Sequence, residues 1–483
     1  MFNKKLLAAS MAAAMVAQVQ AVTVQENNLG QLLLAPLYVT NTNVDTEVVV
    51  SNTRTDTAVV AKIVFRDGTI SSELLDFFIY LSPGDVFRAT VTDDPATVAT
   101  GGAQITSTDD SMTDNDGNFT GTTTGITQTF FSGETGAGAE NRGHFEVIGM
   151  SALQGSCNTA QGATPVTVEA GMSKVSLRAM AIALIADGGS LAYSNNANAN
   201  CTASSVDPET MLMTGEVKIV TAAGAEWASY VIPALGPDTY GDWADDCTTT
   251  GTTGAAGCVI NNANYTTNLN VETLLGANFG IQNQALSGAT LALGGAGILS
   301  NTNDNINGIE MALATENTFN ETYETGTGDA VYNVVTFPTR YRHRTGATNY
   351  AANPYPAGSC DNGAGGTGVV AGQEYLEPFN LTNGSVTYAH AAWDDFENTI
   401  IVNSNFSGGQ VQTNTFPLEV NIEQLTNTVG TNTQGRADIN FVETGSNAGA
   451  ASDCGYYGVP ALSSAIKVKG GQPTWIQSAD LRD

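Results

Sequence analysis

The sequence has few charged residues, and positively charged ones are especially scarce. Charged residues make up 13% of its 483 residues, and 17 Lys and Arg oppose 47 Asp and Glu, which gives a net charge of −30. The usual charged share is about 25%. A chain this acidic repels nucleic acid, so we expect no nucleic-acid partner. Because 42% of the residues are hydrophobic, the chain can build a large core and is not an acidic disordered protein.

The sequence also lacks a hydrophobic run long enough to span a bilayer as a helix, so we expect no transmembrane segment. Its N-terminus has the pattern of a secretory signal. Lys4 and Lys5 precede an apolar run from Leu6 to Val19, and Ala21 ends a small-residue cleavage site. We therefore assign residues 1–21 to a signal peptide and expect the mature chain to be secreted.

Motifs of known enzymes are missing as well. The three histidines, His144, His343 and His390, are far apart and belong to no HExxH motif, and no GxSxG occurs. The SxxK pattern at Ser464–Lys467 lacks its usual partner motifs. Acid pairs of the kind that glycosidases use are abundant, but in a chain with 47 acids their abundance decides nothing. We predict that the protein is not an enzyme.

Cysteines are few but even in number, which in an exported chain predicts up to three disulfides. Without a CxxC pair or a histidine near any cysteine, a zinc site is disfavoured. The number of possible pairings is about 15. Our preferred pairing is sequential: Cys157–Cys201, Cys247–Cys258 and Cys360–Cys454.

Alternating apolar and polar residues dominate the mature sequence and predict β-strands. Ala61, Ile63 and Phe65 alternate with Lys62, Val64 and Arg66 before a turn at Asp67-Gly68, which is period-two patterning. Strands at short spacing joined by turns favour an antiparallel sandwich. We predict a mainly β-fold: an antiparallel β-sandwich, Ig-like or jelly-roll-like, with long loops and one or two short helices. The best helix candidate begins after Ser173 and ends at Gly188-Gly189.

Composition divides the mature chain into three parts. Residues 22–99 contain the first sandwich strands, and residues 100–143, rich in Gly, Thr and Asp, form an insertion or arm. Residues 144–483 are again β-rich, and we expect them to share a core with the first part or to pack on it.

The arm contains the best candidate for a metal site. It carries several hard oxygen ligands on a short segment, which suits calcium, although the spacing is not that of an EF-hand. The candidate calcium ligands are Asp109, Asp110, Asp114, Asp116 and Asn118. Calcium is the one cofactor that we expect.

Positive charge gathers in the segment VVTFPTRYRHR. Arg340, Arg342 and Arg344 lie within five residues, whereas no other basic residue occurs between Lys218 and Arg436. In a strand these arginines share one face. Three roles are open for these arginines. They could protect a strand edge from improper pairing. They could instead contact another copy of the protein or bind an anionic cell-surface glycan, because the planar guanidinium binds a carboxylate through two hydrogen bonds.

Several strand-like segments resemble a group of secreted bacterial proteins. The segments VVVSNTRTDTAVVAKIVFRDGTISSELLDFFIYLSPGDVF, GHFEVIGM, TGEVKIV and NVVTFPTRYRHR occur in this order. They resemble uncharacterised, surface-layer-like cell-surface proteins. The resemblance implies a large β-rich protein at the surface of a bacterium and carries no active site.

These observations favour an extracellular structural protein that associates with copies of itself in a surface layer or filament. Lysine commonly blocks strand edges, and its scarcity leaves edges available for pairing between subunits. A glycan-binding adhesin is the alternative, and a secreted polysaccharide hydrolase is less favoured.

Overall fold

The fold is known from a computed structural model, and it is described over most of the N-terminal half and parts of the C-terminal half. The described residues are 23–68, 73–94, 102–112, 126–130, 141–160, 163–186, 201–205, 211–221, 223–224, 226–236, 314–315, 317–324, 330–336, 400–406, 410–416, 420–424, 434–443, 459–469, 472–477 and 479–480.

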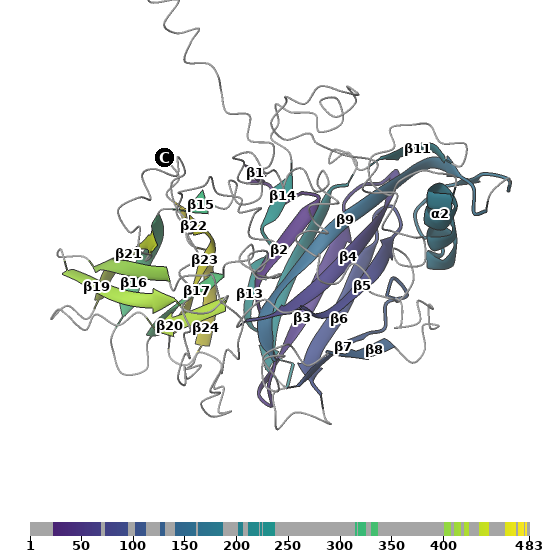
Figure 1. Ribbon diagram of the computed structural model, residues 1–483. Helices are drawn as coiled ribbons and strands as arrows, with labels where there is room; N and C mark the ends of the chain where they lie inside the picture. Colours follow the sequence, from purple (N-terminus) through teal and green to yellow (C-terminus); the bar gives the residue numbers. More distant parts are fainter. Residues whose placement is uncertain are drawn as a thin grey trace, which may run out of the picture.

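Two antiparallel sheets stack to form a large sandwich (Figure 1). The eight-stranded sheet has the order β1-β14-β2-β9-β4-β5, and β10 and β11 also pair with β9. Its strands are β1 (Thr23–Val24), β2 (Leu32–Val39), β4 (Thr57–Asp67), β5 (Glu73–Leu81), β9 (Arg142–Cys157), β10 (Val166–Thr167), β11 (Cys201–Ser205) and β14 (Ala234–Gly236).

The six-stranded sheet faces it and has the order β13-β12-β3-β6-β7-β8. Its strands are β3 (Val44–Asn52), β6 (Val86–Asp93), β7 (Ala103–Ser107), β8 (Ile126–Thr129), β12 (Met213–Thr221) and β13 (Glu226–Val231). The prediction of a mainly antiparallel β-sandwich is therefore confirmed.

Alternation along the strands explains which side chains fill the space between the sheets. In β3 the buried positions alternate with half-buried ones, and Val48 and Val50 enter the sandwich core. In β4 the core receives Ala61, Ile63 and Phe65. Successive side chains of a strand point to opposite faces, so Lys62 and Arg66 lie on the face turned away from this core. That face is buried too, because every residue of β4 is buried.

The segment 100–143 contributes to the sandwich. β7 and β8 extend the six-stranded sheet, and the core includes Ala103, Ile105 and Phe130. This part of the segment is therefore structural and does not form an arm apart from the fold. Its apolar residues are few but spaced by two, which places them on one face of each short strand.

The predicted helix is present as α2 (Lys174–Ala186) at one end of the sandwich (Figure 1). Ser173 caps it, because its Oγ accepts a hydrogen bond from the backbone N–H of Ser176 at 3.2 Å. Leu177 and Met180 are buried where the helix packs against β5 and β9. It is the one helix in the described part of the chain.

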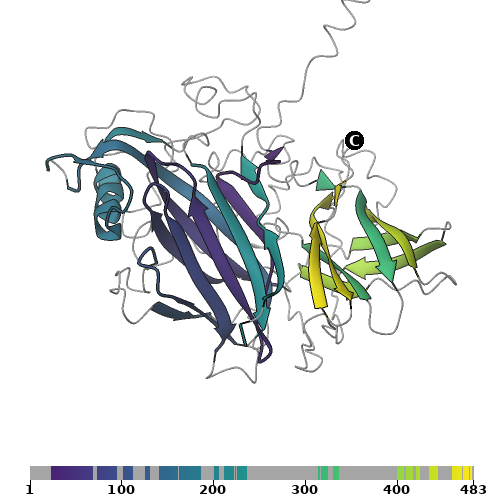
Figure 2. The same cartoon turned by 180° about the vertical axis from the view of Figure 1, so that it is seen from behind.

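The C-terminal half forms smaller antiparallel sheets at the opposite end from α2 (Figures 1 and 2). A five-stranded sheet has the order β19-β18-β21-β16-β25, a four-stranded sheet has the order β20-β17-β23-β24, and β15 pairs with β22. Their strands are β15 (Ala314–Thr315), β16 (Asn317–Glu324), β17 (Ala330–Thr336), β18 (Ile400–Phe406), β19 (Gln410–Phe416), β20 (Val420–Gln424), β21 (Gln434–Glu443), β22 (Val459–Pro460), β23 (Leu462–Lys469), β24 (Gln472–Gln477) and β25 (Ala479–Asp480).

A second apolar core joins the four-stranded sheet to the sandwich. It contains Leu37, Val39, Val44 and Ile219 from the sandwich with Tyr332, Val334, Val420 and Ile466 from the four-stranded sheet. Two hydrogen bonds cross the same junction. The Thr336 hydroxyl donates to the Pro36 carbonyl at 2.6 Å, and the Val420 N–H donates to the Gly68 carbonyl at 2.9 Å. Strands from residues 144–483 thus contribute to the sandwich core and also form the second core that packs on the sandwich.

Candidate functional site

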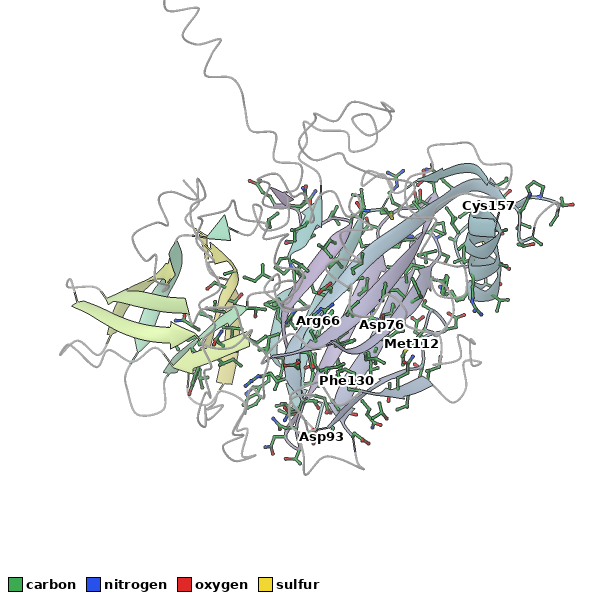
Figure 3. The ribbon with its side chains drawn as sticks, viewed as in Figure 1. Arg66, Asp76, Asp93, Met112, Phe130 and Cys157 are labelled. Atoms are coloured by element: carbon green, nitrogen blue, oxygen red, sulfur yellow. The ribbon has the colours of Figure 1, made fainter. Side chains whose placement is uncertain are left out.

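Four charged side chains form a buried group on the outer face of the eight-stranded sheet. Val64 of β4 pairs with Glu146 of β9 on one side and with Asp76 of β5 on the other. Lys62 and Arg66 lie two residues before and after Val64, so their side chains share its face. The four charges, Lys62, Arg66, Asp76 and Glu146, therefore surround Val64 with alternating sign, and we call them the charge quartet. Figure 3 labels Arg66 and Asp76 on adjacent strands.

The quartet is closed by two ion pairs that are almost fully buried. Arg66 Nε donates to Glu146 Oε1 at 2.8 Å, and both side chains are 0% exposed. Lys62 pairs with Asp76, and these side chains are 3% and 1% exposed. Burial raises the pKa of Asp76 and Glu146, although the neighbouring cations act in the opposite direction. Such pairs gain little net stability, but losing one partner is costly because the other charge stays buried.

His144 lies beside the quartet as a neutral side chain. It is paired directly with Arg66 across β9 and β4. Burial, and then the nearby Arg66 charge, lowers the pKa of His144 to about 3. Neither ring nitrogen has a hydrogen-bond partner among the residues that the structure describes. The histidine is 1% exposed, so it cannot exchange protons readily with an external substrate.

The arrangement is suited to fixing strand register and not to chemistry on a bound molecule. A shift of β4 by one residue would turn Lys62 and Arg66 into the apolar sandwich core. The opposite charges on β5 and β9 would then lose their partners. This role is not evident from the local sequence, because charged residues such as Lys62 and Arg66 that alternate with apolar ones are typical of a solvent-facing side of a strand. The signal that was available is Asp76, an acid inside the apolar run LLDFFIYL.

A third ion pair attaches the helix to the sandwich. Lys174, the first residue of α2, pairs with Asp85, whose Oδ2 also accepts hydrogen bonds from the Ser82 N–H at 3.0 Å and the Ser82 hydroxyl at 2.9 Å. Burial lowers the pKa of Lys174 to about 8. The carboxylate thus links the turn between β5 and β6 to the beginning of α2.

Two of the predicted calcium ligands lie in the described part of the chain. Asp109 Oδ1 accepts a hydrogen bond from the Ser111 N–H at 2.8 Å, which folds a local turn. Asp110 lies 4.0 Å from Lys174 Nζ, and burial together with the charge of Asp109 raises the pKa of Asp110. Asp114, Asp116 and Asn118 lie outside the described residues. Within the described ranges, no three His, Cys, Asp or Glu residues cluster as a metal site would require, and calcium remains a prediction.

The register of β9 and β11 places Cys157 directly opposite Cys201. Directly opposed residues of an antiparallel pair have Cα atoms about 4.5–5.5 Å apart, within the range of about 4.4–6.8 Å that a disulfide requires. The strand pairing therefore supports the first of the predicted disulfides, and the bond itself remains a prediction. The other four predicted partners, Cys247, Cys258, Cys360 and Cys454, lie outside the described residues, as do Arg340, Arg342 and Arg344.

The strand at one border of the five-stranded sheet differs from the other sheet borders. β19 pairs only with β18 in the part of the chain that the structure describes. It has seven residues, QVQTNTF, with neither a charge nor a proline. Native edge strands are usually short, charged or interrupted by proline, and an edge without these features is a template for pairing with another chain. We therefore regard β19 as the candidate functional site.

No helix in the described residues is long and apolar enough to cross a membrane. In comparisons with known proteins, no family model, no curated protein and no solved structure matched the chain.

Proposed function

We propose that the protein is an extracellular structural protein that associates with copies of itself in a surface layer or filament. The observation that carries the proposal is the uncharged, proline-free border strand β19. Backbone N–H and C=O groups along such a border bond to an added strand, and this mode of association needs no dedicated pocket. The signal-peptide pattern at residues 1–21 supports an extracellular location.

The strong acidity of the chain regulates this association. Copies that each carry a net charge of −30 repel one another, and the repulsion weakens as salt shortens the screening length from about 30 Å at 0.01 M to about 10 Å at 0.1 M. Calcium bound at the predicted aspartates would reduce the repulsion further. Assembly is therefore expected to increase with ionic strength and with calcium.

Electron microscopy of negatively stained protein tests the proposal. Ordered layers or filaments are expected at high protein concentration, and more of them after calcium is added. Discrete single particles in every condition, together with tight and selective glycan binding by those particles, would instead indicate an adhesin.

The arginine segment can be tested in the same way. Replacing Arg340, Arg342 and Arg344 with Ser removes three of the few positive charges in the chain, so subunits should repel more strongly and assemble less. A charge-matched control replaces Arg54, Arg88 and Lys218, which lie on the sandwich, with Ser. Normal assembly by the triple variant would show that the three arginines are not a subunit contact.

A further inference from the structure

β19 is the outermost strand of the small sheets, at the end of the molecule farthest from α2 (Figures 1 and 2). It forms a hairpin with β18, in which Phe406 pairs with Gln410 next to the turn and Ile400 pairs with Phe416 at the open end. β18 continues the sheet by pairing with β21. A strand added beside β19 would therefore extend an existing sheet of five strands.

The other sheet borders are poorly suited to pairing with another chain. Border strands of only two residues are β1, β10, β15, β22 and β25, and β8 has four residues. β24 contains Pro473 and packs beside β13, which contains Glu226. β20 contains Glu423, and its first N–H bonds to the sandwich at Gly68. Short length, proline and charge are the ordinary protections of a sheet border.

β5 is protected by burial. Its residues from Leu74 to Leu81 are buried, and the Tyr80 N–H donates to the Ser111 carbonyl at 3.2 Å. Part of the outer backbone edge of β5 is thus already hydrogen-bonded to another segment of the same chain. Among the borders of the described sheets, β19 is the longest that has neither charge nor proline, and β11, which shares this composition, has only five residues.

Charge favours a second copy of the same strand as the occupant. Residues 398–418 contain no charged residue, although the chain as a whole carries a net charge of −30. Two copies that approach through this segment bring uncharged residues together, whereas most other contacts would bring acids together. The nearest acids in the sequence are Glu397, which precedes the hairpin, and Glu419, which follows it.

We propose that β19 pairs antiparallel with β19 of a second copy, about a two-fold axis at Thr413. Thr413 is the middle residue of the seven-residue strand, so this register overlaps the whole strand and forms the most backbone hydrogen bonds. It sets Thr413 opposite Thr413 and Gln412 opposite Asn414, which are uncharged pairs. The two five-stranded sheets become one continuous sheet across the axis. This inference rests on the proposed self-association and specifies its contact.

The symmetry has a consequence for assembly. A two-fold contact is closed, because each copy uses the same surface and leaves no free copy of it. Pairing through β19 therefore gives a dimer, and a layer or filament needs a second, different contact between dimers. The dimer is the building block of the larger assembly.

Lysine substitutions test the strand. The variant Gln412→Lys with Thr413→Lys places two like charges at the proposed axis in each copy, and we expect the dimer to be lost at concentrations where the wild type is dimeric. The control is Val166→Lys with Val175→Lys, which makes the same change in net charge at positions that are 42% and 63% exposed near the other end of the molecule. The control should dimerise as well as the wild type or better, because it reduces the acidity.

Cross-linking tests the register without disturbing the charge. Thr413→Cys should give a disulfide-linked dimer under mild oxidation, because directly opposed Cα atoms are about 4.5–5.5 Å apart. Gln410→Cys should give none, because the two cysteines would stand six residues apart across the strands, about 20 Å at about 3.4 Å per residue. The wild-type protein, oxidised in the same way, measures how much disulfide-linked dimer the natural cysteines form by themselves.

The outcomes separate this inference from the proposed function. Loss of the dimer in the lysine variant alone, with cross-linking at 413 and not at 410, is the expected result. If the wild type assembles and the lysine variant assembles equally well, or if cross-linking fails at 413 or occurs at 410, the β19 contact is wrong while self-association stands. A wild type that stays monomeric in all conditions overturns both.

Discussion

At the scale of single residues, the charge quartet connects the sequence to strand register. Arg66 and Glu146 are 0% exposed and bonded at 2.8 Å. Glu146→Gln should lower the free energy of unfolding by about 3–5 kcal/mol, because it leaves the Arg66 charge buried without its carboxylate. Chemical denaturation would measure the loss.

The matched control for this prediction is the double variant Arg66→Met with Glu146→Leu. Replacing both ions with apolar groups is often close to neutral, so the double variant should be more stable than Glu146→Gln. If Glu146→Gln costs less than about 1 kcal/mol, the surroundings of Arg66 are far more polar than the quartet implies.

Asp93 should make stability depend on pH. Burial, and then the charge of Asp45, raises the pKa of Asp93 from 3.8 to about 6. The folded state therefore holds this proton more tightly than the unfolded state, and stability falls as the pH rises from about 4 to about 6. Asp93→Asn removes the effect, so it should stabilise the protein at pH 7.5 by on the order of 1 kcal/mol after allowance for solvent screening.

Urea denaturation of Asp93→Asn and the wild type at several pH values would check this prediction. The difference in stability between them should disappear below pH about 4, where both side chains are neutral. A variant that is less stable than the wild type at pH 7.5 would contradict the assignment.

At the scale of elements, the pairing of β9 with β11 leads to a prediction about disulfides. Cys157 and Cys201 are directly opposed, so peptide mapping without reduction should find them linked. Replacing both with Ser should lower the free energy of unfolding by about 2–4 kcal/mol, because the unfolded chain loses a cross-link. Finding Cys157 joined to any other cysteine would refute the sequential pairing.

Sequence patterns predicted the strands and the helix whose formation depends on residues close together in the sequence. The alternation of Ala61, Ile63 and Phe65 predicted β4, and Ser173 predicted the beginning of α2. What they could not predict is the choice of distant partners. Thr336 bonds to Pro36 across 300 residues of sequence, and nothing in either local pattern identifies the other. The same limit hid the quartet, because Lys62 indicates a buried site only once Asp76 and Glu146 are placed beside it.

The features of β19 could be predicted from the sequence only in part. Its lack of charge and proline was readable in QVQTNTF, but the strand could not be recognised as a border until the order of the five-stranded sheet was known. A strand with the same composition at the centre of a sheet would have both sides paired and no tendency to associate.

At the scale of the whole molecule, the protein combines a well-packed sandwich with smaller sheets, and among its described strands β19 pairs on one side only. The second core, with Leu37 and Val39 against Tyr332 and Val334, joins the two parts. The buried ions fix the strand register within the sandwich, whereas the contact that we propose between copies falls on the uncharged hairpin. In this proposal, a net charge of −30 opposes the contact until salt or calcium screens it.

Sedimentation velocity of the wild-type protein, over a wide range of concentration, at low and high salt and with calcium, tests whether copies of the chain associate. We expect a dimer whose fraction grows with concentration and ionic strength, followed by larger species. A single monomeric species at every concentration and in every salt would contradict this expectation.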